Sequence, residues 1–406
     1  MNFDFPFLFF GTIIFISCQN DSTTITFDVL DHNIKNVISC EPENSSEILA
    51  GKIYHDLHYI PLETNFQSLV DERHVVKIID NHIGVLNINY SNFVLFDWKG
   101  NYILSIGSKG KHPGNLSSTY DFTILDNKIY FPSHSNKTFV IYDMDGEYVK
   151  SVFVDNAYKK LLRTKDFIIA STKNLPERYN SSNENIAFYD KNLLKILNFG
   201  FVPKYLEFID LYDIIYKSYN NNEIIYHQIL SDTIFRINSE RIMSYYQINN
   251  TPIFEIDKQD YDITFNMQNG LFDKYMNNPK ATYPTRNILD TKKYLILFYM
   301  FDYKHFITIY SKTEGISKTF HFDSDDIRNH VFHPSMDFTS MDNRMLIETN
   351  IQNLRSIARL LPENYLSTSN LDSILNNTDL DENSNPMIVT YRLNEEYADH
   401  LFSNNN

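Results

Sequence analysis

The densest group of side chains that could do chemistry lies in the last quarter of the 406-residue chain. It combines imidazoles and carboxylates in one short stretch, namely His321, Asp323, Asp325, Asp326, His330 and His333. Carboxylates suit a hard cation and imidazoles suit zinc, but no single metal prefers this mixture. The spacing also differs from the His-Glu-x-x-His pattern of a helix-borne zinc site. We therefore expect a solvated loop without a cofactor, and one divalent metal ion is the alternative.

A second candidate is a glycine-rich stretch that could approach a ligand closely. Its members are Gly107, Gly110, His112, Pro113 and Gly114. A phosphate-binding Walker loop needs Gly-Lys followed by Ser or Thr at the start of a helix, whereas Lys111 is followed by His-Pro-Gly. The sequence predicts a loop between strands whose glycines permit unusual backbone angles. A ligand-facing role is the alternative.

Other catalytic patterns are weak in this sequence. Asp325 and Asp326 could serve acid–base chemistry, but adjacent carboxylates on a turn are usually solvated. The stretch from Asp379 imitates the start of a calcium loop, yet Ser384 and Thr390 stand where an EF-hand needs Gly and Glu. No Gly-x-Ser-x-Gly nucleophile elbow occurs. No catalytic residue is therefore predicted.

The N-terminus has the pattern of an export leader. Residues 5–17 are apolar and end directly at Cys18, which is too short for a membrane span of about 20 residues. Residues 15–18 resemble a bacterial lipobox, which implies a signal peptide over residues 1–17 and lipidation of Cys18. Gln19 resembles the outer-membrane sorting rule. The lipid would hold the chain at a membrane without crossing it, on the cell surface or, alternatively, facing the periplasm. An uncleaved N-terminal anchor or a misassigned start would also explain this apolar run.

Residues 18–50 are polar and show no sustained period, which predicts a tether. Cys40 lies within it, and we expect a free thiol there. Asp21-Ser22-Thr23 resembles the acceptor of one bacterial O-glycosylation system. The tripeptides that contain Thr233 and Ser373 match the same pattern.

These candidates must be positioned by a repeated element. Residues 93–106 return as a close copy at residues 139–152, each an apolar run, a polar break with Gly100 or Gly146, and a second apolar run. That pattern predicts two antiparallel strands joined by a tight turn. A third copy at residues 186–196 lacks the glycine, and Asn192 is expected to replace it.

Equal spacing of such hairpins predicts a solenoid or a propeller. Each hairpin follows another strand pair, so four strands make one unit, and later units begin near residues 214, 294 and 345. We predict an all-β, six-bladed β-propeller of four-stranded antiparallel blades over residues 51–396, with a polar tail at 397–406. A β-solenoid is the alternative.

Two further features belong to the last blade. Residues 58–64 should lie beside the C-terminal strand and close the ring. Apolar residues spaced as on one helix face predict a short helical insertion, and these are Leu354, Ile357, Ala358 and Leu361. Leu371, Ile374 and Leu375 predict a second short helix beside it.

Several stretches resemble one family. Residues 103–115 are similar to the "Ile-Gly-x-x-Gly-x-Gly-Pro-Gly-Glu" signature of six-bladed, NHL-like β-propeller lipoproteins found beside bacterial outer-membrane uptake systems. Residues 59–64, 232–237 and 385–393 look like the same family. The resemblance spans roughly residues 58–394 and implies the fold rather than an activity. His112 and Asn115 stand where the family has Gly and Glu.

Composition limits the possible partners. The net charge of −15 argues against nucleic acid, which needs a basic footprint. The 28 Tyr and 31 Phe residues favour sheet, and some could form a sugar-stacking platform. We therefore predict a surface-anchored lipoprotein whose propeller binds or scaffolds a protein or glycan partner. The alternative is a metal-dependent lyase or lactonase-like hydrolase with its site at the central channel.

Overall fold

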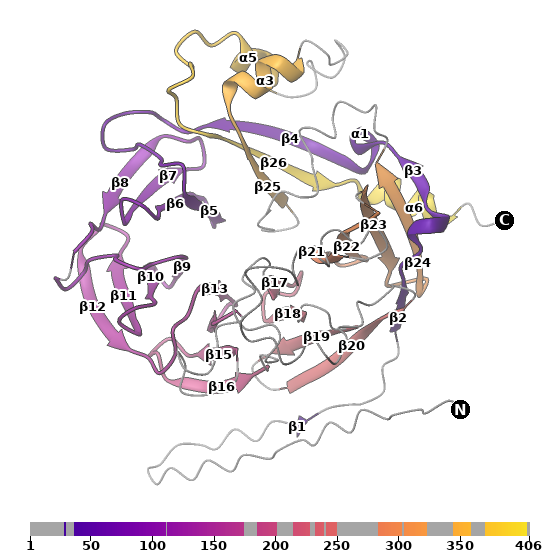
Figure 1. The fold of residues 1–406 in the computed structure, drawn as a ribbon, viewed down its shortest axis with the longest axis horizontal. Coiled ribbons are helices and arrows are strands. Elements are labelled where there is room, and N and C mark those ends of the chain that lie inside the picture. Colours follow the sequence, from indigo (N-terminus) through magenta and orange to yellow (C-terminus); the bar gives the residue numbers. More distant parts are fainter. Residues whose placement is uncertain are drawn as a thin grey trace, which may run out of the picture.

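The computed structural model describes residues 28–29, 36–110, 112–173, 185–200, 214–227, 232–238, 241–249, 283–302, 304–322, 344–358 and 370–403. Within these ranges, the strands form six sheets placed around a central axis (Figure 1). The predicted six-bladed, all-β propeller is therefore confirmed. In each of the first five blades, the first strand along the chain lies nearest the axis (Figure 1).

The first three blades are four-stranded antiparallel sheets. Blade 1 contains β5 (His74–Ile79), β6 (His82–Asn87), β7 (Asn92–Asp97) and β8 (Tyr102–Ile106). Blade 2 contains β9 (Thr123–Leu125), β10 (Lys128–Ser133), β11 (Thr138–Asp143) and β12 (Tyr148–Phe153). Blade 3 contains β13 (Lys160–Arg163), β14 (Ile168–Ser171), β15 (Ile186–Tyr189) and β16 (Lys195–Phe199).

The other three blades carry contributions from the N-terminus. Blade 4 contains β17 (Ile215–Lys217), β18 (Glu223–His227), β19 (Thr233–Asn238) and β20 (Arg241–Asn249). Blade 5 contains β21 (Tyr283–Asp290), β22 (Tyr294–Phe301), β23 (Lys304–Ser311) and β24 (Ile316–Phe322). Blade 6 contains β25 (Arg344–Thr349), β26 (Met387–Leu393) and β4 (Tyr54–Pro61).

The predicted closure of the ring is confirmed. The N-terminal strand β4 pairs antiparallel with β26, with Ile60 opposite Ile388. Four strands were predicted for this blade, and three pair within the described ranges. The side-chain amide of Asn370 binds the backbone of Tyr59 through both its oxygen (2.9 Å) and its nitrogen (2.7 Å), and so covers part of the outer edge of β4.

The predicted helical insertion lies between β25 and β26. Its helices are α3 (Ile351–Ala358) and α5 (Leu371–Leu375), which stand outside the ring beside β4 (Figure 1). Leu354, Leu371 and Ile374 are buried, as their spacing predicted. Leu361 lies outside the described residues.

The predicted tether over residues 18–50 is wrong for residues 28–29 and 36–50. Strand β1 (Asp28–Val29) and strand β2 (Asn36–Ser39) pair parallel with β20, and β3 (Ser46–Ile48) pairs parallel with β24. A short 3-10 helix, η1 (Pro42–Asn44), and helix α1 (Ala50–Ile53) complete the segment. The N-terminal segment thus adds strands to the outer edges of blades 4 and 5 before it enters blade 6.

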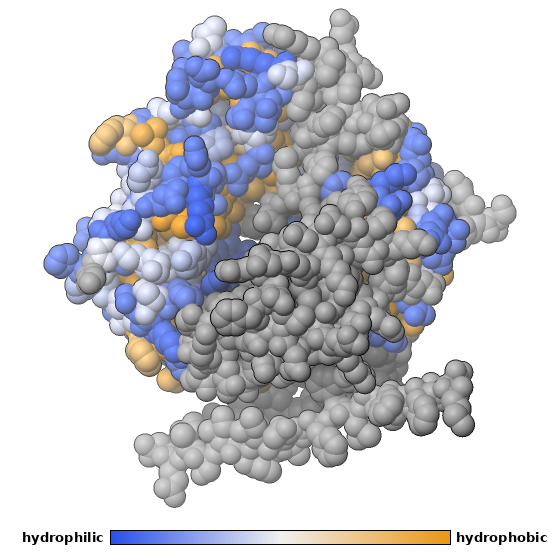
Figure 2. Space-filling view, in the orientation of Figure 1, coloured by the Kyte–Doolittle hydropathy of each residue, from blue (hydrophilic) through white to orange (hydrophobic). Residues whose placement is uncertain are grey.

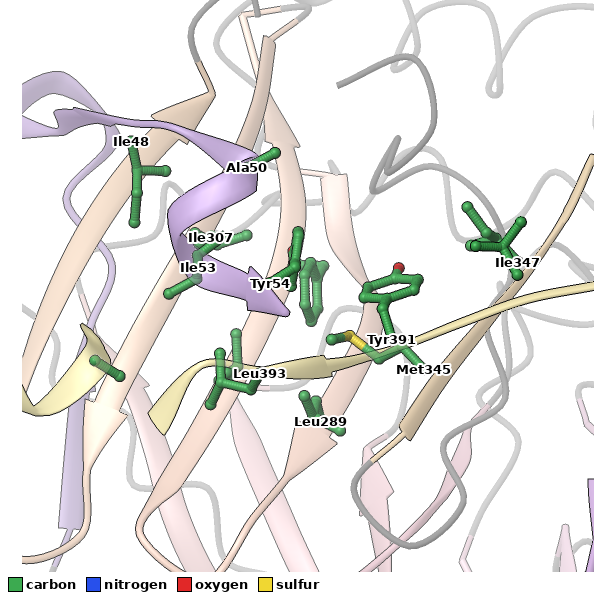
Figure 3. Close-up of a cluster of buried hydrophobic side chains, with 14 of the residues drawn as sticks. Ile48, Ala50, Ile53, Tyr54, Leu289, Ile307, Met345, Ile347, Tyr391 and Leu393 are labelled. Atoms are coloured by element: carbon green, nitrogen blue, oxygen red, sulfur yellow. The ribbon is translucent and has the colours of Figure 1, made fainter. Parts of the chain in front are cut away.

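Burial explains why this segment is ordered. Ile38 is fully buried and Ile48 is 2% exposed, so each polar-looking strand places one isoleucine in the core. Cys40 between them is a buried free thiol, as expected, and burial raises its pKa to about 12. Figure 3 shows Ile48, Ala50 and Ile53 facing residues from blades 5 and 6. The core therefore lies between the blades, and the N-terminal segment fills one of these interfaces.

The predicted polar tail is also wrong in part. Helix α6 (Glu395–Ser403) follows β26 directly and buries Ala398 and Phe402. Asp399 accepts a hydrogen bond from the ammonium of Lys293 (2.7 Å) and another from the hydroxyl of Tyr294. The C-terminus is therefore fastened to blade 5.

Each copy of the sequence repeat contains an aspartate that fixes its turn. The carboxylate of Asp97 accepts hydrogen bonds from the backbone N–H groups of Lys99 (2.8 Å) and Asn101 (2.9 Å). Asp143 and Asp190 bind the residues two and four positions later in the same way. This Asx geometry fixes the turn before the outermost strand.

The turn also needs a left-handed residue three positions after the aspartate. Gly100 and Gly146 fill it with φ of 87°, and in blade 3 Leu193 fills it with φ of 64°. The expectation that Asn192 would take this role is therefore wrong. Leu193 is 8% exposed and belongs to the core cluster between blades 2 and 3, so its burial offsets the backbone strain.

Candidate functional site

The innermost strands of blades 1 to 3 converge on one buried ion pair. Lys77 on β5 extends its ammonium to the carboxylate of Asp121, 2.7 Å away, just before β9. The same ammonium donates to the backbone carbonyls of Phe122 (2.9 Å) and Leu161 (2.8 Å). A lysine ammonium has three donors, and each has an acceptor here. Lys77 therefore joins β5, β9 and β13.

Asp121 completes the same network. Its carboxylate accepts a hydrogen bond from the backbone N–H of Leu161 at 2.7 Å. Lys77 is 5% exposed and Asp121 is 1% exposed. Because a buried charge is costly unless it is paired and hydrogen-bonded, these contacts make the two residues interdependent. Chemically, the pair is a structural cross-link at the axis.

Tyr120, which directly precedes Asp121 in the sequence, belongs to a small group of aromatic and basic side chains. The ring of Tyr120 meets the imidazole of His134 edge to face, with 5.9 Å between centroids. The ammonium of Lys159 lies 6.0 Å from the centre of the Tyr120 ring. All three are partly exposed. This group could contact a ligand at the blade 2 and blade 3 side of the axis.

A second buried ionic cluster joins blades 4 and 5. The fully buried carboxylate of Asp290 contacts the guanidinium of Arg236 (2.9 Å) and the ammonium of Lys312 (2.5 Å). It also accepts a hydrogen bond from the hydroxyl of Ser218 at 2.8 Å. Burial lowers the pKa of Lys312, against the opposing effect of Asp290. The exposed ring of Tyr219 lies over both cations, at 5.1 Å from Arg236 and 4.4 Å from Lys312.

The predicted glycine loop connects β8 to β9 and is held by its own contacts. Gly107 has φ of 83°, and a Cβ there would lie 2.5 Å from Leu116. The N–H of Gly110 donates to the hydroxyl of Ser117 (2.9 Å), and that hydroxyl donates to the Gly110 carbonyl (2.7 Å). The prediction of a loop between strands is confirmed.

The other end of this loop is fixed in the same manner. Gly114 has φ of 87°, and its carbonyl accepts a hydrogen bond from the hydroxyl of Tyr142. Asn115, which stands where the resembled signature has glutamate, donates from its amide to the Ser108 carbonyl at 3.1 Å. His112 and Pro113 are exposed. The glycines thus serve packing, and the exposed tip is the part that a ligand could reach.

The candidate metal ligands are only partly described. His321 lies on β24, where its Nδ1 is 2.9 Å from the hydroxyl of Ser45, next to the added strand β3. Its imidazole therefore contributes to the attachment of the N-terminal segment. Five further candidates lie outside the described residues, namely Asp323, Asp325, Asp326, His330 and His333. Among the described residues, no group of three or more His, Cys, Asp or Glu side chains could hold a metal ion.

Two of the candidate modification sites lie within the described residues, on different elements. Ser373 is exposed on α5, where its hydroxyl donates to the Asn370 carbonyl at 2.8 Å. Thr233 is partly buried at the start of β19. Cys18 and Ser22 lie outside the described residues. Of the described positions, Ser373 lies in the insertion of blade 6 and Thr233 in blade 4, on other elements than the glycine loop and the axial pair.

The sequence did not reveal Lys77 and Asp121 as a site. Lys77 interrupts an otherwise apolar strand, and Asp121 directly precedes another. A lysine inside the run Val75-Val76-Lys77-Ile78-Ile79 is the only signal, because a charge there needs a buried partner.

A family model described as "Domain of unknown function (DUF4934)" matches residues 34–392. The chain belongs to this family. The match starts just before β2 and ends within β26, so the DUF4934 domain includes the added strands β2 and β3. The family assignment thus agrees with the structure that residues 36–50 are part of the propeller.

Several solved structures are similar to this DUF4934 protein. A protein of Bacteroides fragilis NCTC 9343, described as exported, superposes with a TM-score of 0.65 at 17% identity, over 88% of this chain and 99% of that chain. A member of the duf4221 family from Bacteroides vulgatus ATCC 8482 has a TM-score of 0.48 at 10% identity, over 84% and 96%. Virginiamycin B lyase from Staphylococcus aureus has a TM-score of 0.38 at 11% identity, over 67% and 76%. The first of these likenesses supports the propeller fold and nothing more specific.

No curated protein matches the sequence. In the parts of the chain that the structure describes, the helices are too short or too polar to cross a membrane.

Proposed function

We propose that this DUF4934 protein is an outer-membrane lipoprotein, displayed on the cell surface, whose propeller is a binding or scaffold module for a protein or glycan partner. The axial ion pair is the observation that carries the proposal for the propeller. All three donors of Lys77 are used to join blades 1, 2 and 3, so this central polar group serves rigidity. A rigid ring is a suitable platform for binding groups on its loops.

The proposed localisation has separate support. Residues 5–17 end at Cys18 in the manner of a lipoprotein leader. The similar structure from Bacteroides fragilis is described as an exported protein. Within the described residues, the earliest strand that pairs with the ring starts at Asp28, so the proposed tether ends before that residue.

Metabolic labelling with radioactive palmitate tests the proposed lipid anchor. We expect the wild-type chain to incorporate label and the Cys18→Ala variant to incorporate none. Surface display predicts that protease added to intact cells removes the wild-type protein. Equal labelling of both chains would overturn the lipid anchor, and full protection from protease would favour the periplasm-facing orientation.

A binding measurement tests the role of the propeller. The purified full-length chain would be immobilised and exposed to a glycan array and to a phage-displayed library of random peptides. We expect saturable binding to one of the two probes. Absence of saturable binding to both would contradict the binding role.

A further inference from the structure

Three large apolar side chains are exposed on two neighbouring segments near the seam where blade 6 meets blade 1. They are Phe66 (94% exposed) and Leu69 (46%) between β4 and β5, and Tyr90 (64%) between β6 and β7. We call these three residues the seam patch. Figure 2 shows apolar atoms at the upper left, over the connection that precedes β5.

Hydrogen bonds tie the two segments of the seam patch to each other. The amide of Asn87 donates to the Leu69 carbonyl at 2.9 Å and accepts from the N–H of Asp71 at 3.0 Å. The carboxylate of Asp71 in turn accepts from the backbone N–H groups of Asn89 (3.0 Å) and Tyr90 (3.4 Å). Leu69 and Tyr90 are thus held on one framework.

The segment that carries Phe66 is fixed as firmly. The fully buried hydroxyl of Ser68 donates to the Glu63 carbonyl at 2.7 Å. Asn385 lies two residues before β26 of blade 6. Its side-chain amide donates to the carbonyls of Glu63 and Ser68 at 2.8 Å each, and accepts a hydrogen bond from the N–H of Val70 at 2.9 Å. Phe66 therefore projects from a loop that is anchored on both sides.

The fold itself gains little from these apolar side chains, because a phenyl ring that is 94% exposed leaves its apolar surface in water. Buried polar residues nevertheless hold the backbone of its loop in place. A preorganised aromatic residue loses little conformational freedom on binding, and such residues dominate the energy of protein interfaces. The arrangement is that of an anchor for a partner.

The chemistry of the patch selects the kind of partner. A phenyl ring carries no polar atom, and its full exposure allows it to enter a pocket that contacts both faces and the edge. Exposed charges on the same segment are Glu63, Glu72 and Arg73, with a net charge of −1, on a chain of net charge −15. The complementary surface is an apolar pocket bordered by Lys or Arg side chains.

We propose that the seam patch is the docking surface for a protein partner, with Phe66 inserted into an apolar, basic-rimmed pocket. This inference rests on the proposed binding function and names its surface and partner class. It places recognition on blade 1, opposite blade 4 in the ring, where the N-terminal segment first joins (Figure 1).

Peptide selection tests the inference with a defined probe. A phage-displayed library of random peptides would be selected on the full-length wild-type chain alone. Enriched peptides would be synthesised, and their dissociation constants measured by fluorescence anisotropy. We expect apolar peptides with Lys or Arg, whose dissociation constant rises at least about tenfold for Phe66→Ala and for Tyr90→Ala.

A matched control variant is available on blade 2. Phe153 is 73% exposed on β12, so Phe153→Ala removes a similar ring away from the patch and should leave the dissociation constant unchanged. Unchanged circular dichroism melting curves would show that the variants fold. Higher salt should weaken binding to the basic peptides.

The outcomes separate this inference from the proposed function. Peptides that bind Phe66→Ala as well as the wild type would overturn the seam patch and leave the binding role intact. Selection of acidic peptides would overturn the basic-rimmed partner, and a glycan whose binding needs Phe66 would overturn the protein partner. Failure of the wild-type chain to bind any peptide or glycan would overturn both proposals.

Discussion

His74 and Glu348 form a hydrogen-bonded pair across the seam of the ring, with 2.5 Å between the imidazole Nε2 and the carboxylate. His74 begins the innermost strand of blade 1, and Glu348 lies near the end of β25 in blade 6. The pair joins residues that are 274 positions apart in sequence. Closure of the ring thus depends on a titratable contact as well as on backbone pairing with β4.

This contact should make stability depend on pH. Burial favours the neutral imidazole of His74, but the hydrogen bond and charge of Glu348, with contributions from Asp71, outweigh it and raise the pKa above 6.5. The pair therefore stabilises the fold fully below the unfolded pKa, and this contribution is lost as the pH rises through the folded pKa. Glu348→Gln should lower the free energy of unfolding by about 1 kcal/mol in mild acid and less in mild base. Urea unfolding at a series of pH values measures this, and an identical pH profile for both chains would contradict it.

Loss of one partner of the axial pair should be severe. In Lys77→Met, the carboxylate of Asp121 stays buried without its cation, and breaking a buried pair in this way costs about 3 to 5 kcal/mol. Chemical denaturation measures the free energy of unfolding. The double variant Lys77→Met with Asp121→Asn should recover part of the loss, because no charge is then left buried. A single variant as stable as the wild type would show that the pair is dispensable.

The turn glycine of blade 1 should resist substitution. Gly100 has φ of 87°, and a Cβ there would lie 2.1 Å from the carbonyl oxygen of Pro61 at the end of β4. Gly100→Ala should therefore destabilise the fold by more than the roughly 1 to 2 kcal/mol of left-handed strain alone. Gly315→Ala is the control, since its φ is 71° but its nearest neighbour is 4.0 Å away. Thermal unfolding should rank the two variants in this order, and equal losses would argue against the clash.

The added strand β2 offers a paired test of the N-terminal segment. Ile38 is fully buried, so Ile38→Ala should lower the free energy of unfolding by about 2 to 5 kcal/mol. Val37, next to it, is 42% exposed, so Val37→Ala should change it by about 0.5 kcal/mol or less. If residues 36–50 were a tether, both variants would be as stable as the wild type. Urea unfolding of the two chains distinguishes these cases.

Cys40 reports on the same segment by its reactivity. Burial keeps its pKa near 12, so little reactive thiolate is present at neutral pH. In a Cys18→Ser background it is the remaining cysteine of the chain. We expect slow labelling by a maleimide in the wild-type fold and faster labelling in Ile38→Ala, measured by mass spectrometry. Rapid labelling of the unmodified fold would show that the segment detaches readily.

The sequence predicted the blades because their hairpins carry a local signal. Asp97 and Gly100 recur as Asp143 and Gly146, and the structure shows that the aspartate binds the turn while the glycine takes the left-handed angle. Leu193 departs from this pattern. It takes the left-handed position because its side chain packs between two blades, which is a tertiary contact. The residue types of a turn can therefore be recognised in the sequence, whereas the packing between blades cannot.

The N-terminal strands and the site escaped prediction for a related reason. Strands β2 and β3 are four and three residues long, too short to show alternation, and their partners lie about 200 to 275 residues away. Lys77 and Asp121 are single charges beside apolar runs, and only the fold reveals that they meet. The seam patch likewise consists of ordinary loop residues until their exposure is known.

Strands β2, β3 and β4 have partners in blades 4, 5 and 6. These N-terminal strands therefore cannot pair until the later blades have been synthesised. During synthesis or secretion from the N-terminus, these strands would emerge long before β20, β24 and β26 exist to receive them. Their unpaired edges would then be open to wrong partners, which makes a chaperone that holds the unfolded chain advantageous until the later blades exist.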